Sequence, residues 1–139
     1  MRYKRFKNVY AVRIDKGEEI TEKLKELCKA ERISFAQVHA IGASERAVLG
    51  VFDLNRQEYA REACTGFCEI TSLAGNITTV NDEPYIHLHA TLADQQHCIH
   101  GGHVLELSVG ATCEMFLHVI DEAVGRVRDD QLGINLWEL

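Results

Sequence analysis

The histidines of this chain are concentrated in one stretch, because five of the seven lie between Tyr85 and His103. The stretch from Tyr85 to Leu92 alternates polar and apolar residues, which is the two-residue period of a half-buried strand. On such a strand His87 and His89 share one face, and the apolar residues between them point into a core. Two imidazoles on one face can converge on a single ion.

A third histidine, His103, follows Gly101 and Gly102, whose backbone freedom can bring it back toward the pair. Imidazole is a good ligand for zinc and other borderline divalent ions, and three ligands with an open fourth position are typical of catalytic or exchangeable sites. The pattern predicts a site for a divalent metal, with zinc favoured, made of His87, His89 and His103. The alternative is a set of unrelated, partly exposed strand histidines. We interpret His97 and His100 as loop residues outside the site.

Glu69 is the candidate catalytic residue, because it lies within the apolar segment Phe67–Gly75. A carboxylate placed there needs a partner, since burial of an unpaired charge is costly. It can orient a ligand histidine or act as a base on a metal-bound water. The alternative is a solvent-facing position at a sheet edge. The sequence contains no nucleophile elbow, phosphate loop or dinucleotide fingerprint.

Charge and cysteine content narrow the class of protein further. The net charge of −6 disfavours a protein that coats nucleic acid, although the residues from Arg2 to Lys7 form a basic run. Five cysteines are an odd number, which favours reduced thiols and a cytoplasmic protein. We interpret Cys64 and Cys68 as small buried hydrophobic residues rather than half of a zinc site. No apolar run is long enough to span a membrane, and no secretory signal is visible.

The remaining pattern predicts one domain, residues 1–139, of the α+β class: a mainly antiparallel sheet with one principal helix packed on it. The helix is expected from an Asp15 cap to about Ala30, with an apolar stripe from Ile20 to Cys28. Turns are expected at residues 42–44 and at Gly110, and a break at Ala74–Gly75. The expected strands are 8–14, 34–41, 46–54, 58–64, 66–79, 85–93, 104–109, 111–120 and 133–139, with a loop over 121–130.

The segments Glu69–Gly75, Pro84–Leu92 and Gly101–His103, in this order, resemble the PPC (plants and prokaryotes conserved) domain family, and the resemblance covers nearly the whole chain. It implies an α+β domain that assembles as a homotrimer, with metal ligands at His87, His89 and His103. Plant members carry AT-hooks before the domain. The only Gly-Arg here is Gly125–Arg126, without a following proline, so DNA contact would need a basic surface made by assembly.

Three functions remain open at this point, and the least favoured of them is a DNA-binding regulator. The first is a stand-alone PPC protein: a metal-coordinating, homotrimeric binding or regulatory module for a protein partner or a small ligand, with DNA association disfavoured by the acidic charge. The second is a small metal-dependent enzyme, a hydrolase or lyase, that uses the three histidines at a subunit interface, with Glu69 as the base.

Overall fold

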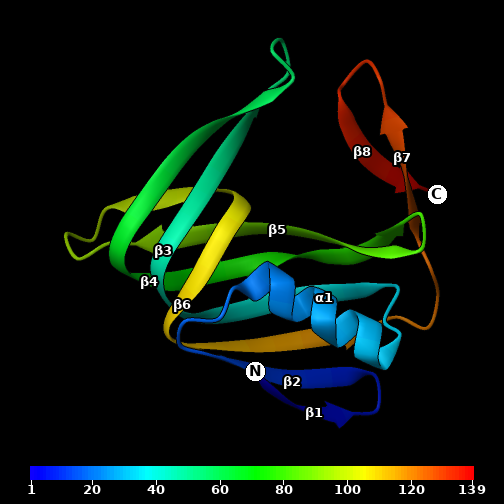
Figure 1. Cartoon of the computed structure of the whole chain (residues 1–139), viewed down its shortest axis with the longest axis horizontal. Helices are drawn as coiled ribbons and strands as arrows, with labels where there is room; N and C mark the ends of the chain where they lie inside the picture. The colour runs from blue at the N-terminus through cyan, green and yellow to red at the C-terminus, as the bar shows by residue number, and fades with distance from the viewer.

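A computed structural model describes all residues of the chain, 1–139. It contains one helix and eight strands (Figure 1). In chain order the elements are β1 (Arg2–Phe6), β2 (Val9–Asp15), α1 (Ile20–Glu31), β3 (Ala36–Asp53), β4 (Glu58–Val80), β5 (Glu83–Ala93), β6 (Ile99–Val119), β7 (Gly125–Asp129) and β8 (Ile134–Glu138).

The strands form one strongly bent sheet with the order β1-β2-β6-β3-β4-β7-β8, and β5 pairs with both β4 and β6. Strands β3, β4, β5 and β6 therefore close a ring in which each strand has two partners. All pairings are antiparallel except one: β7 runs parallel to β4 through the pair Thr79–Gly125. The α+β class with one helix is confirmed, and the sheet is mixed.

Helix α1 packs against the sheet with the four residues expected for its apolar stripe: Ile20, Leu24, Leu27 and Cys28 are all buried. The prediction of Asp15 as N-cap is wrong. Glu19 is the cap; its carboxylate accepts from the Glu22 N–H at 2.7 Å and from the Leu107 N–H at 3.2 Å. A glutamate is an unusual cap, but its longer side chain ties the helix start to β6 as well.

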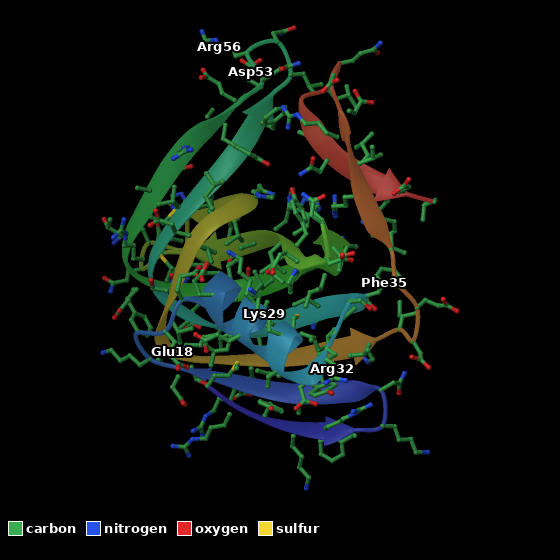
Figure 2. The ribbon with its side chains drawn as sticks, turned by 45° about the vertical axis from the view of Figure 1, so that its right-hand side comes forward. Glu18, Lys29, Arg32, Phe35, Asp53 and Arg56 are labelled. Atoms are coloured by element: carbon green, nitrogen blue, oxygen red, sulfur yellow. The ribbon has the colours of Figure 1, made fainter.

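Two predicted turns are bends within long strands. The expected turn at residues 42–44 lies inside β3, where the pairing shifts register between Ala40 and Gly42 and again between Ser44 and Arg46. The expected junction at Gly110 lies inside β6 in the same way. A β-bulge bends a strand without ending it, and it uses the same small residues as a turn. The long strands β3 and β4 extend to a hairpin tip at Asp53 and Arg56 (Figure 2).

Four further expectations about strands and loops need correction. The irregularity of β4 lies between Ile70 and Ser72 rather than at Ala74–Gly75. Gly101 and Gly102 form no turn, because both lie within β6 and pair with β5. The terminal basic run forms β1 at the sheet edge, and part of the expected 121–130 loop is β7.

One continuous core of 27 buried residues joins α1 to the inner face of the sheet. Strand β5 contributes Leu88, Ala90 and Leu92 to this core, which leaves the alternate residues of β5 on the opposite face. The chain's one α-helix is neither long nor apolar enough to cross a lipid bilayer.

Substitution of Gly75 tests how closely β4 and β5 pack against each other. A Cβ at Gly75 would lie 1.9 Å from the His87 carbonyl oxygen, whereas a Cβ at Gly101 would lie 3.4 Å from the Ala90 carbonyl oxygen. Gly75→Ala should lower the free energy of unfolding by about 1–3 kcal/mol or more, as for overpacked sites. Gly101→Ala, the matched control on β6, should change it by less than about 0.5 kcal/mol. Urea denaturation measures both, and equal effects would contradict this packing.

Candidate metal centre

The three predicted histidines come together in the folded chain. His87 and His89 project from β5 and His103 from β6, and one ligand nitrogen of each lies within 4.8 Å of the other two. The ring centroids are 5.3 Å apart for His87 and His89, and 5.1 Å and 5.4 Å from these two to His103. The rings form a triangle with no carboxylate or thiol among its members.

The pairing of β5 with β6 brings the third histidine into place. In the antiparallel register His89 lies directly opposite His103, so their side chains share a face. The hairpin between the strands turns at residues 94–98, where the Asp94 carboxylate accepts from the backbone N–H groups of Gln96 and Cys98. Next to His103, Gly102 allows β3 to approach, because a Cβ there would lie 2.8 Å from the Gly50 carbonyl oxygen.

Two side chains from distant strands wall the triangle. The Tyr59 ring, from β4, stacks on His103 with centroids 4.9 Å apart and an angle of 23° between the planes. The Arg126 guanidinium, from β7, lies 4.6 Å from the centre of the Tyr85 ring. The β3–β4 arm and the β7–β8 hairpin, which carry these residues, both rise above β5 in Figure 1, with the hairpin to the right of the arm.

Arg126 is held in place by four contacts. Its Nε donates to Thr78 Oγ1 at 2.8 Å, Nη1 to the Asn135 carbonyl at 2.8 Å, and Nη2 to Asn76 Oδ1 at 2.9 Å. The fourth and longest contact, 3.3 Å, joins Nη2 to His87 Nδ1. Since guanidinium has no acceptor, His87 Nδ1 must be the acceptor, and the proton of the neutral ring lies on Nε2.

Burial and neighbouring charge keep two of the rings neutral. Burial lowers the pKa of His87 to about 4, with further lowering by His103 and Arg126. Burial also lowers the pKa of His103, with a smaller effect from His89. A neutral imidazole has a free lone pair, which is the form that ligates a metal.

The donor set fits a borderline divalent ion such as zinc. Zn–N bonds of about 2.0–2.1 Å place tetrahedral ligand nitrogens about 3.4 Å apart, so small side-chain rotations suffice from within 4.8 Å. His103 Nδ1 is buried without a hydrogen-bond partner, as expected at a site for an ion or water. The Arg126 contact is the one feature that opposes the fit. His87 cannot accept from Arg126 through Nδ1 and also ligate through Nδ1, and ligation through Nε2 moves the ring proton to Nδ1.

Glu69 lies apart from this triangle. It is exposed, and it pairs with Ala93, four residues beyond His89 and about 13 Å along β5. Within one chain it does not reach the histidines. His100, expected in a loop, lies in β6, with its ring nitrogens 2.9 Å from Glu62 and 3.0 Å from Asp94. His97 is an exposed turn residue, as expected.

The sequence analysis missed Tyr59 and Arg126. Both lie more than 25 residues from the histidines they contact, so no local motif marks them. The one available signal is that Arg126 lies in a short segment, Val124–Arg128, in which arginines alternate with valines as on a strand.

Residues 1–121 match the model of the Plants and Prokaryotes Conserved domain, abbreviated PCC or PPC. This match spans most of the 139 residues, and the chain belongs to this family. The hairpin of β7 and β8, which supplies Arg126, follows the matched range. No functionally characterised protein in the curated comparison matches the chain.

Solved structures with similar folds include three that cover 99% of this chain. A protein from Bacteroides thetaiotaomicron, described as a candidate DNA-binding protein, has 28% identity, a TM-score of 0.95 and 96% of its own chain covered. A PPC protein from Pyrococcus horikoshii has 29% identity, a TM-score of 0.88 and 94% covered. A metal-containing protein from Archaeoglobus fulgidus has 30% identity, a TM-score of 0.87 and 97% covered.

The lowered pKa values of His87 and His103 predict how the stability of the metal-free protein depends on pH. A histidine in the unfolded chain has a pKa near 6.5. Below that pH the unfolded chain therefore binds more protons than the folded chain, in which the pKa values of His87 and His103 are lower. The stabilisation is complete above about pH 6.5 and is lost as the pH falls toward 4. In His87→Gln the free energy of unfolding, measured by urea titration at several pH values, should fall less steeply across this window. The exposed-residue control His118→Gln should keep the wild-type slope, and identical slopes in all three proteins would contradict the prediction.

Proposed function

We propose that this PPC protein is a metal-coordinating binding module that acts as a homotrimer, with a divalent ion, zinc favoured, held by His87, His89 and His103. The observation that carries the proposal is the convergence of three imidazoles from two paired strands, with ligand atoms within 4.8 Å of one another. The metal-containing relative from Archaeoglobus fulgidus supports it.

A zinc ion on three imidazoles would offer one open coordination position to a small ligand or to a side chain of a protein partner. This chain's own residues shape the approach to that position. The Tyr59 ring covers His103 and excludes water from that side, and Arg126 adds a fixed positive charge beside His87. An aromatic wall and a cation favour a ligand that combines an apolar body with an anionic or electron-rich donor group.

The homotrimer is supported by exposed apolar residues on the face of the sheet opposite α1. Ile41 and Phe116 are both 54% exposed, and the pairs Ile41–Glu114 and His39–Phe116 place them on one face of β3 and β6. Next to Ile41 a groove of about 690 Å³ also contains Phe67. Adjacent apolar side chains of this size are characteristic of interfaces between protein chains.

A DNA-associated role is the second candidate, because the relative from Bacteroides thetaiotaomicron is described as a candidate DNA-binding protein. In this chain it would use β1, where Arg2, Lys4 and Arg5 are exposed at the sheet edge. The net charge of −6 opposes it, since binding to phosphates depends on accumulated positive charge. The metal-coordinating module is therefore the better-supported function.

Native mass spectrometry with metal analysis tests both parts of the proposal. The purified chain should show the mass of three chains and one divalent ion at each three-histidine site. His87→Ala and His103→Ala should each weaken metal affinity by at least about a hundredfold, because loss of a ligand exceeds the ten- to hundredfold effect of removing a ligand's hydrogen-bond partner. The control His39→Ala, an exposed strand histidine, should retain the metal. A single-chain mass would refute the trimer, and undiminished affinity in both variants would refute the site.

Arg126 provides a separate test of the ligand geometry, because metal binding must end its contact with His87. Arg126→Met keeps most of the side-chain volume but removes the competing donor and the positive charge. We expect metal affinity to rise by about tenfold, the equivalent of about 1.4 kcal/mol, which is near the upper end of the usual net contribution of one hydrogen bond, about 0.5–1.5 kcal/mol. The control Arg128→Met alters an exposed arginine of the same hairpin and should leave affinity unchanged. Competitive titration with a chromophoric chelator measures both, with thermal unfolding as a check on folding, and weaker binding in Arg126→Met would contradict the competition.

A further inference from the structure

A second group of metal-ligating side chains lies on the other face of β6. Glu62 and Cys64 of β4 and His100 of β6 each offer a ligand atom within 4.8 Å of the other two. His100 and His103 are three residues apart on one strand, and an odd spacing places their side chains on opposite faces. His100 pairs with Leu92 rather than with a histidine, which agrees with this separation.

The two ring nitrogens of His100 each contact a different carboxylate. Nδ1 lies 2.9 Å from Glu62 Oε1, the carboxylate that forms the three-residue group together with Cys64 and His100. Nε2 lies 3.0 Å from Asp94 Oδ2. Asp94 is itself fixed, because its other oxygen accepts from the Gln96 and Cys98 N–H groups, each at 2.9 Å. A carboxylate that accepts from one ring nitrogen while the other ligates a metal is the usual arrangement at histidine metal sites.

Burial and an adjacent pocket also favour a ligand here. Cys64 is only 8% exposed, and His100 is partly buried. The polar pocket of about 290 Å³ beside them is lined by Cys64, Thr65, Cys68, Asp94, Gln96 and His100. It leaves room for a fourth ligand, such as water. The donors are one thiolate sulfur, one imidazole nitrogen and one carboxylate oxygen, a set suited to Zn²⁺ or Co²⁺ and not to Mg²⁺ or Ca²⁺.

We propose that Glu62, Cys64 and His100 form a second, thiolate-containing site for a zinc-type divalent ion, with Asp94 as the positioning residue that holds His100. On binding, the proton of the Cys64 thiol and any proton on His100 Nδ1 are released to solvent, while the Nε2 proton stays hydrogen-bonded to Asp94. The competing explanation is a metal-free cluster in which a protonated His100 bridges two carboxylates. This proposal does not depend on the three-histidine site.

Cobalt spectroscopy separates the two sites, because only the second contains a thiolate. We would titrate the reduced full-length chain with Co²⁺ and follow the thiolate-to-Co²⁺ charge-transfer absorption in the near ultraviolet. We expect two Co²⁺ ions per chain and one charge-transfer band. The band should persist in His87→Ala, which affects only the other site. A titration that produces no charge-transfer band would overturn the proposal.

Variants identify the ligands. Cys64→Ser should abolish the charge-transfer band. Glu62→Gln and His100→Gln should each lower the affinity for Co²⁺ at least tenfold. The cysteine controls Cys68→Ser and Cys98→Ser should keep the band. Loss of the band in Cys68→Ser or Cys98→Ser, with retention in Cys64→Ser, would overturn the assignment. Circular dichroism and thermal unfolding of each variant confirm that it is folded, and Glu62→Gln keeps the test decisive if Cys64→Ser unfolds.

The role of Asp94 has its own readout. Asp94→Asn retains one oxygen acceptor for the hairpin but presents an amide to His100 Nε2. We expect a 10- to 100-fold loss of Co²⁺ affinity with the charge-transfer band still present at saturation, as for other partners of ligand histidines. Unchanged affinity would show that Asp94 does not position His100, and loss of the band at saturation would show that it acts as more than a positioning residue.

Discussion

The pairing of β5 with both β4 and β6 is the constraint on which the rest of this structure depends. It closes the ring of β3, β4, β5 and β6, and it buries the apolar face of β5 in the common core. With Leu88 and Leu92 directed inward, His87 and His89 have only the opposite face available. A shift of β5 by one residue in its pairing register would exchange the two faces. The register that buries the apolar residues of β5 is therefore the same register that forms the histidine triangle. Gly75 is part of that requirement, because a Cβ there would lie 1.9 Å from the His87 carbonyl oxygen of β5.

The electrostatics of the triangle serve two purposes that oppose each other. Burial, mutual repulsion and the Arg126 charge keep His87 neutral, which preserves its lone pair for a metal. The same arginine donates to that ring, and it would repel a bound cation. Three shorter hydrogen bonds, to Thr78, Asn76 and the β8 backbone, hold the Arg126 guanidinium. These bonds can keep the guanidinium in place when its contact with His87 is lost. In the metal site proposed above, Arg126 would make the C-terminal hairpin a determinant of metal affinity.

The hairpin of β5 and β6 presents histidines in two contrasting environments. On one face, the three imidazoles contact one another, the Tyr59 ring and the Arg126 guanidinium. The pKa values of His87 and His103 are lowered there. On the other face, His100 lies between two carboxylates, and its hydrogen bonds to Asp94 and Glu62 raise its pKa. In the metal-free chain, protonation is therefore disfavoured at His103 and favoured at His100, three positions earlier on the same strand. Neighbouring groups, and not position in the sequence, make this difference.

The sequence by itself determined the α+β class, the helix with its apolar stripe, and the shared face of His87 and His89, because each depends on a local period of side chains. Only the tertiary structure decided that the Gly42 and Gly110 regions bend within long strands, since a bulge and a turn use the same residue types. The reason expected for the proximity of His103 to the pair was wrong: strand pairing, and not a glycine turn, brings His103 to His87 and His89. Tyr59, Arg126 and the environment of His100 could not be read from the sequence. Their partners lie on strands that are distant along the chain, and contacts of that kind arise only when closure of the ring brings those strands together.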